Sequence, residues 1–89
     1  MPEEKISLLE FPTAFPIKIM GEAQAGFAQA MIEIVLKHAP DYDAAGIEMR
    51  PSSGGKYLGL TCTITATSQQ QLDALYFELS GHPLVRVVL

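Results

Sequence analysis

The hydrophobic residues of this chain switch between two spacings, and the order of the switches constrains the fold more than any single motif does. Apolar residues at every second position indicate half-buried strands in four segments: 15–21, 47–50, 58–66 and 84–89. Apolar residues at every third or fourth position indicate amphipathic helices in two: 22–38 and 68–80. The predicted order is therefore strand, helix, strand, strand, helix, strand.

Local signals at the helix ends agree with this order. Glu22 is expected in the first turn of the first helix and Lys37 in its last turn, where each charge matches the helix dipole. That helix should end before Pro40, because the proline ring disfavours a helical conformation in the residue before it. Ser68 followed by Gln71 predicts a capping box at the start of the second helix.

Each predicted element has one apolar face, and together these faces define the expected core. Its members in chain order are Phe15, Ile17, Ile19, Phe27, Met31, Ile34, Val35, His38, Leu58, Leu60, Cys62, Ile64, Ala66, Leu72, Leu75, Tyr76 and Leu79. In the last strand, alternation predicts Val85, Val87 and Leu89 on one side.

Two one-faced helices and four strands predict an α+β fold. The simplest arrangement is a ferredoxin-like βαββαβ sandwich, a four-stranded antiparallel sheet with two helices on one face. Residues 1–10 are expected to be a partly flexible N-terminal arm, and 11–89 a single domain. The other sheet face should be mixed in character, with Lys18, Met20, Glu48, Arg50, Thr61, Thr63, Thr65 and Arg86. A partner would bind that face or a sheet edge.

Charge and composition exclude several classes of partner. The net charge of -4 among 89 residues disfavours nucleic acid, whose phosphates such a chain repels. The start of the sequence is acidic where a secretory signal is basic, and no apolar run is long enough to cross a membrane. Cys62 is the only cysteine, so no internal disulfide or paired-cysteine metal site is expected. We therefore expect a cytoplasmic protein without nucleic-acid or membrane partners.

The segment PSSGGKY at 51–57 raises the question of phosphate binding. A phosphate-binding P-loop lies between a strand and a helix and has Ser or Thr after its Lys, whereas Tyr57 follows Lys56 here between two strands. Gly54 and Gly55 are expected to supply positive φ angles in a hairpin turn. A minor anion-binding nest of N–H groups is the alternative.

No residue set predicts catalysis, a metal or a cofactor. His38 and His82 lie far apart, and His38 falls on a helix face near its C-terminal end. Cys62 alternates with core residues, where a free cysteine packs as a small hydrophobe. Asp41 and Asp43 alone do not make a calcium loop. We expect a chain that is not an enzyme.

Each known activity of this topology requires particular residues that this chain lacks. RNA recognition needs stacking aromatics on a basic sheet, but KYLGLT at 56–61 has leucines there. A metallochaperone of this topology has two cysteines after its first strand, where this chain has MGEAQAG. An acylphosphatase has an arginine in that loop and an asparagine elsewhere, and this chain has no asparagine.

Seven short segments in register carry a resemblance to a known family. They are LLEFPT at 8–13, KIMG at 18–21, HAP at 38–40, PSSGGKY at 51–57, TITAT at 63–67, LYFEL at 75–79 and VRVVL at 85–89. The chain resembles the YbeD family of small bacterial proteins of unknown biochemical function. That resemblance implies a ferredoxin-like fold similar to the ACT-type regulatory domain of phosphoglycerate dehydrogenase.

The resemblance does not carry an amino-acid site over to this chain. ACT domains bind amino acids beside the turn after the first strand, commonly with an aspartate and a Pro-Gly pair, whereas this turn reads GEAQAG. Family members also often have Lys or Arg where this chain has Gly54, although Lys56 restores a charge nearby.

Two functional hypotheses follow. The first is a non-catalytic regulatory or protein-interaction module that binds another protein and forms a homodimer through a sheet edge or face. The second is a sensor of an amino acid or carboxylate, bound in the turn from Gly21 to Ala25 by helix N–H groups, against which the charge of Glu22 argues. Candidate binding residues are Gly21, Glu22, Ser52, Ser53, Lys56 and Tyr57.

Overall fold

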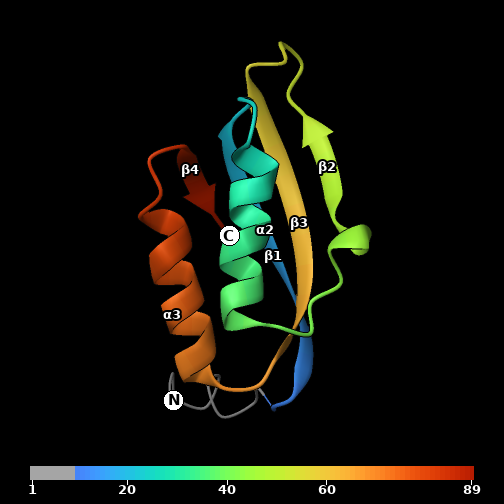
Figure 1. Cartoon of the computed structure of the whole chain (residues 1–89), viewed down its shortest axis with the longest axis vertical. Coiled ribbons are helices and arrows are strands. Elements are labelled where there is room, and N and C mark those ends of the chain that lie inside the picture. The colour runs from blue at the N-terminus through green and yellow to red at the C-terminus, as the bar shows by residue number, and fades with distance from the viewer. Residues whose placement is uncertain (1–9) are drawn as a thin grey trace, which may run out of the picture.

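The chain folds into one antiparallel sheet covered on one face by two helices (Figure 1). The computed structural model describes residues 10–89, so the expected arm lies, apart from Glu10, outside the described residues. The strands are β1 (Thr13–Glu22), β2 (Glu48–Pro51), β3 (Tyr57–Ala66) and β4 (Val85–Val88), and the helices are α2 (Phe27–His38) and α3 (Gln69–Ser80). A short 3-10 turn, η1 (Ala44–Gly46), precedes β2. The predicted βαββαβ order and fold class are confirmed.

The sheet order is β2-β3-β1-β4, so the two long strands lie in the middle and the two short ones at the edges. β1 and β3 pair over ten residues each, from Thr13 opposite Ala66 to Glu22 opposite Tyr57. Since both crossovers return on the same side, α2 and α3 lie side by side over one face. Nothing among residues 10–89 covers the other face in the same way, and we call it the open face.

The core lies between the helices and the sheet, as the periodicity predicts. Its largest fully buried side chains are Ile17, Ile19, Phe27, Met31, Val35, Leu60, Cys62, Ile64, Leu75 and Leu79. These come from the predicted faces of both long strands and both helices. Tyr42, from the loop after α2, is also buried, and the sequence pattern did not predict it.

Two expectations about α2 are wrong. The helix begins at Phe27 after Gly26, which has a φ of 88°, and no acidic residue lies in its first turn. Glu22 is instead the last residue of β1, because the chain needs residues 23–26 to turn before the helix starts. Lys37 does lie in the last turn, and α2 ends before Pro40 as predicted.

The start of α3 matches the capping prediction with one change. The Ser68 hydroxyl accepts a hydrogen bond from the Gln71 backbone N–H at 3.0 Å. The Gln71 side-chain oxygen in turn accepts a hydrogen bond from the backbone N–H of Thr67 at 2.6 Å, rather than from that of Ser68. Its amide nitrogen also donates to the His38 carbonyl at 2.9 Å, which links the start of α3 to the end of α2.

The last strand differs from the alternation that its sequence suggests. The pairing of β4 with β1 shifts register between Met20 and Gly21, which is a β-bulge. Val85 and Val88 therefore pack against the core, while Val87 lies on the open face. The prediction that Val85 and Val87 share a side is wrong, because one extra residue in the strand inverts the alternation after it.

Candidate functional site

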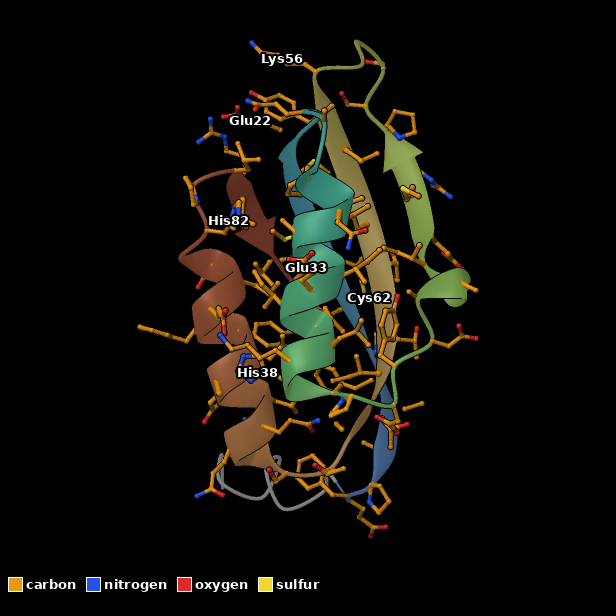
Figure 2. All side chains as sticks on the ribbon, in the orientation of Figure 1. Glu22, Glu33, His38, Lys56, Cys62 and His82 are labelled. Atoms are coloured by element: carbon orange, nitrogen blue, oxygen red, sulfur yellow. The ribbon has the colours of Figure 1, made fainter. Side chains whose placement is uncertain are left out.

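The structure brings the six candidate binding residues to one end of the sheet. Glu22 lies opposite Tyr57 in the β1–β3 ladder, and Gly21 lies opposite Leu58. The turn after β1 is joined to the β2–β3 hairpin by the Ala23 N–H, which donates to the Lys56 carbonyl at 3.0 Å. Figure 2 shows Glu22 and Lys56 at this same end.

The segment 51–57 turns the chain between β2 and β3, as predicted. The Ser52 backbone N–H donates to the Tyr57 carbonyl at 2.9 Å, and its side-chain oxygen accepts from the Tyr57 N–H at 3.1 Å. Gly55 has a φ of 73° and its N–H donates to the Ser52 carbonyl. Gly54 does not have a positive φ, so the expectation for that glycine is wrong. The polar groups of Ser52 are used within the turn.

Ser53 and Lys56 are exposed at the tip of this hairpin, and Tyr57 is half-buried. The Lys56 ammonium lies 5.9 Å from the centre of the Tyr57 ring, within range of a cation–π contact. The two side chains therefore contact each other on the hairpin.

Gly21 has a packing reason to be glycine. A methyl group on this residue would lie 2.5 Å from the Leu84 carbonyl oxygen and closer still to the Phe27 ring. The Leu84 carbonyl accepts a hydrogen bond from the Glu22 N–H at 3.0 Å, so β4 approaches β1 closely just where the bulge occurs. The space beside Gly21 is occupied by the Phe27 ring and the Leu84 backbone.

The carboxylate of Glu22 is compensated by its neighbours. Arg86, from the bulged strand, forms an ion pair with it, and the Gln24 amide donates to its other oxygen at 2.8 Å. The turn after β1 therefore does not present an isolated negative charge.

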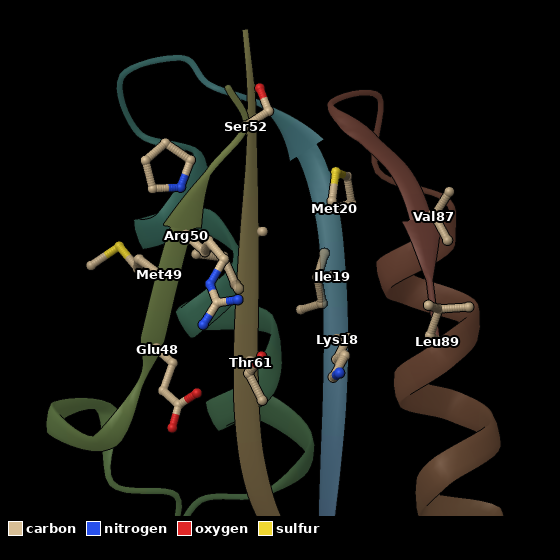
Figure 3. A pocket seen from close by; sticks show the side chains of 13 residues that line it. Lys18, Ile19, Met20, Glu48, Met49, Arg50, Ser52, Thr61, Val87 and Leu89 are labelled. Carbon is tan, nitrogen blue, oxygen red and sulfur yellow. The ribbon is translucent and has the colours of Figure 1, made fainter. Parts of the chain in front are cut away.

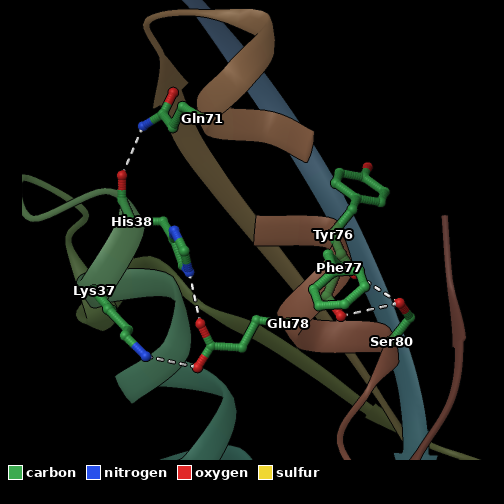
Figure 4. A network of polar contacts seen from close by, with 7 residues as sticks. All are labelled: Lys37, His38, Gln71, Tyr76, Phe77, Glu78 and Ser80. Atoms are coloured by element: carbon green, nitrogen blue, oxygen red, sulfur yellow. Dashed lines mark hydrogen bonds and ion pairs between the residues drawn. The ribbon is translucent and has the colours of Figure 1, made fainter. Parts of the chain in front are cut away.

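A second polar cluster joins the two helices (Figure 4). The His38 Nε2 atom lies 2.8 Å from one oxygen of Glu78, and the Lys37 ammonium lies 3.0 Å from the other. The hydrogen bonds from His38 and Lys37 lower the pKa of the Glu78 carboxyl below its usual value. His38 thus contacts Glu78 of α3 at the edge of the core, as expected for a residue at the C-terminal end of the apolar face of α2.

Cys62 is fully buried beside the hydroxyl of Tyr42. Burial raises the pKa of the thiol, and the contact with Tyr42 offsets only part of that rise. Burial also raises the pKa of Tyr42 well above its usual value. The thiol stays protonated at neutral pH, which agrees with the expectation that Cys62 packs as a hydrophobe.

The open face contains a groove with a volume of about 450 Å³ (Figure 3). The strand registers arrange its side chains in two rows that cross the sheet from β2 to β4. The first row is Glu48, Thr61, Lys18 and Leu89, and the second row is Arg50, Gly59, Met20 and Val87. Gly59 adds no side chain to the second row, and the Met20 methyl group lies 3.6 Å from the position that a Cβ would take there.

Three exposed apolar side chains lie together on the open face: Met20, Val87 and Leu89. Of the other large apolar side chains exposed among the described residues, Met49 borders the groove from the opposite side of edge strand β2, and Leu36 and Phe77 lie on the helices. Val87 is 46% and Leu89 is 72% exposed. Such a concentration on one face is typical of a surface that binds protein.

The sequence pattern placed five of the groove residues on this face but did not predict that Val87 and Leu89 would lie there too. The expected set of Lys18, Met20, Glu48, Arg50 and Thr61 lines the groove. Val87 and Leu89 join it because of the bulge, and no local sequence signal marks a bulge in β4. With these two residues, the face is more apolar than predicted.

The fold and this open face define a class of protein: a small α+β domain of the ACT-like type, with helices on one side of its sheet and a groove on the other. Similar solved structures support the fold. A protein from H. pylori, HP0495, superposes with a TM-score of 0.74 at 10% identity, covering 91% of this chain and 85% of that one. The crystal structure of the ACT domain from GTP pyrophosphokinase of Chlorobium tepidum gives a TM-score of 0.66 at 20% identity, covering 86% and 97%.

The family follows from sequence. Residues 6–89 match the family described as "Protein of unknown function (DUF493)", so the chain belongs to that family. A UPF0250 protein of Bordetella pertussis is 57% identical over 99% of this chain and 94% of its own length. A UPF0250 protein of Nitrosomonas europaea is 54% identical over the full length of both. The resemblance to the YbeD family is confirmed, and its relatives are bacterial.

Proposed function

We propose that this chain is a non-catalytic interaction module whose open sheet face binds protein and so regulates a bacterial cytoplasmic process. The observation that carries the proposal is the position of Met20, Val87 and Leu89, which are exposed together on a sheet face without a helical cover. Burying such side chains contributes about 25 cal/mol per Å² of apolar surface. A protein surface with matching apolar groups would gain this free energy.

The chemistry of the remaining side chains supports a role without catalysis. The only cysteine is buried with a raised pKa, and His38 is engaged with Glu78. Among residues 10–89, no group of three or more metal-binding side chains occurs, and no helix is long and apolar enough to cross a membrane. The single cysteine fits the reducing compartment that the proposal requires.

Site-specific cross-linking tests the proposal. A photo-reactive amino acid would be placed at Val87 in the groove and, as a control, at Glu33 on the exposed side of α2 (Figure 2). We expect one defined cross-linked protein from Val87 and none from Glu33. The purified complex of the two proteins should be weakened at least about tenfold by Met20→Asp, which places a charge among the apolar side chains. Equal products at both positions, or binding indifferent to Met20→Asp, would contradict the proposal.

Sensing of a small carboxylate at the turn after β1 is a second candidate. The ion pair of Glu22 with Arg86 supports it, because the compensated charge removes the repulsion that the sequence suggested. A thermal-shift panel of amino acids and dicarboxylates would test it. A ligand that raises the melting temperature of the wild type, and not that of Arg86→Ala, favours sensing. A panel without any such ligand leaves the interaction module as the better account.

A further inference from the structure

We propose that the occupant of the open-face groove is a second copy of this chain, packed sheet against sheet about a two-fold axis that runs across the strands. The inference rests on the proposed function, because it requires the groove to be a protein-binding surface. It names the partner that the pattern of side chains fits.

The charges on the face are arranged so that a copy can complement them. Glu48 and Arg50 lie two residues apart on β2, in the first and second rows respectively. Within residues 10–89, neither these two side chains nor Lys18 takes part in an ion pair. A face with one anion and one cation at equivalent positions in adjacent rows is complementary to itself when the two rows are exchanged.

A two-fold axis between the rows and parallel to them performs that exchange. Glu48 then faces Arg50 of the second copy, and Arg50 faces Glu48 of the second copy, which gives two symmetric ion pairs. At the other edge, Leu89 faces Val87 of the second copy, so aliphatic side chains meet across the axis. Opposite charges and apolar groups are both matched.

The centre of the face is matched in shape under the same axis. Thr61 faces Gly59 of the second copy, so a side chain lies opposite a position that carries none and is bordered by the Met20 methyl group. The aliphatic stem of Lys18 faces Met20, and its ammonium can remain in water. Two sheets packed face to face lie about 10 Å apart, a gap that these side chains can fill from both sides.

The alternative two-fold axis, parallel to the strands, gives a poorer match. It would set Glu48 against Leu89 and Arg50 against Val87, burying each charge against an aliphatic group without a partner. A charge that loses water and gains no partner in such a position disfavours this packing. The registers of the four strands therefore select the axis that exchanges the rows.

The interface is small, so the association should depend on protein concentration. A standard interface buries about 800 Å² on each partner, whereas four strands lie side by side only at the end of this sheet near Gly21 and Leu58. In this dimer the two sheets face each other, so α2 and α3 of both copies lie on the outer surfaces.

Charge reversal tests the inference by sedimentation equilibrium between about 10 μM and about 1 mM. Arg50→Glu sets like charges against Glu48 at two symmetric places, and we expect the dimer to weaken about tenfold or more. Glu48→Arg should have the same effect for the same reason. The double variant Glu48→Arg with Arg50→Glu restores both pairs, and its affinity should return to within about threefold of wild type.

Glu33→Arg is the matched control for Glu48→Arg, because it makes the same change of charge on the exposed side of α2 and should leave the association unchanged. The melting temperature of each variant shows whether its fold is intact. A wild type that stays monomeric at about 1 mM, or a double variant that is no better than the single ones, would overturn the inference.

The proposed function can fail separately. If the chain is monomeric and the protein cross-linked at Val87 is a different one, the second copy is the wrong occupant and the groove is still a binding surface. If the chain is monomeric and Val87 forms no defined product, both the inference and the proposed function are wrong.

Discussion

The ring of Phe27 occupies the space that a side chain on Gly21 would need. Phe27 is the first residue of α2 and is fully buried, and Gly21 lies in β1 beside the register shift with β4. The contact sets how closely the first turn of the helix and the bulged strand approach the end of β1. Gly21 is therefore a structural residue of the turn where the sequence suggested a ligand.

Replacing this glycine should destabilise the fold. Gly21→Ala would place a methyl group against the Phe27 ring and the Leu84 carbonyl, and overpacking of this kind reduces the free energy of unfolding by about 1–3 kcal/mol. Urea unfolding followed by circular dichroism measures it. Gly46→Ala is the control, because no atom lies within 4 Å of the added methyl group there and the change should be close to neutral. Equal effects at the two positions would contradict this packing argument.

The adjacent glycines of the hairpin should respond differently to the same substitution. Gly55→Ala puts a side chain on a residue with a φ of 73°, and we expect the free energy of unfolding to fall by about 1 kcal/mol. Gly54→Ala, without a positive φ and with open space around it, should change stability little. Lys56→Ala should also be neutral. A large loss for Lys56→Ala would show that the hairpin depends on its charge.

Removing the hydroxyl of Tyr42 should not destabilise the protein. Within the described residues this buried hydroxyl has no oxygen or nitrogen partner, and it lies beside only the weakly hydrogen-bonding thiol of Cys62. Tyr42→Phe removes an underpaired polar group, so the free energy of unfolding should stay the same or rise by about 1 kcal/mol.

The matched control for that substitution is Tyr76→Phe. The Tyr76 hydroxyl donates a hydrogen bond to the Leu89 carbonyl at 3.0 Å, so its loss should reduce stability by about 0.5–1.5 kcal/mol. Chemical denaturation of both variants under the same conditions makes the comparison. A Tyr42→Phe variant that is the less stable of the two would disprove the argument.

The contact of Glu78 with His38 and Lys37 should make stability depend on pH. Because the folded state lowers the pKa of this carboxyl, the contribution is present above its ordinary value of 4.5 and is lost as the pH falls through the lower folded value. Glu78→Gln should therefore lower the melting temperature by a few degrees at pH 7 and by less at pH 3. Thermal scans at the two pH values provide the test.

Glu33→Gln is a suitable control for the pH experiment. Glu33 lies on the exposed side of α2, where it contacts Gln29 within the same helix. Its substitution should change the melting temperature little at either pH. A pH dependence of equal size for both variants would show that the link between the helices does not contribute.

The order of the elements and the faces they bury could be predicted because both depend on neighbours in the sequence. Ile17 and Ile19 in β1, and Leu60 and Cys62 in β3, point into the core as alternation predicts. The Ser68 cap and the hairpin at 51–57 are local hydrogen-bonding patterns, and both are confirmed.

Contacts between distant segments were decided only in the folded chain. The side on which Val87 lies depends on how β4 pairs with β1, and that pairing follows the close approach of Leu84 to Gly21, 63 positions earlier in the sequence. The partners of Glu22 and of Glu78 likewise come from other elements. Periodicity indicates which face of a strand is apolar. A single extra residue in a ladder reverses that face, and the position of the extra residue is determined only by pairing with the neighbouring strand.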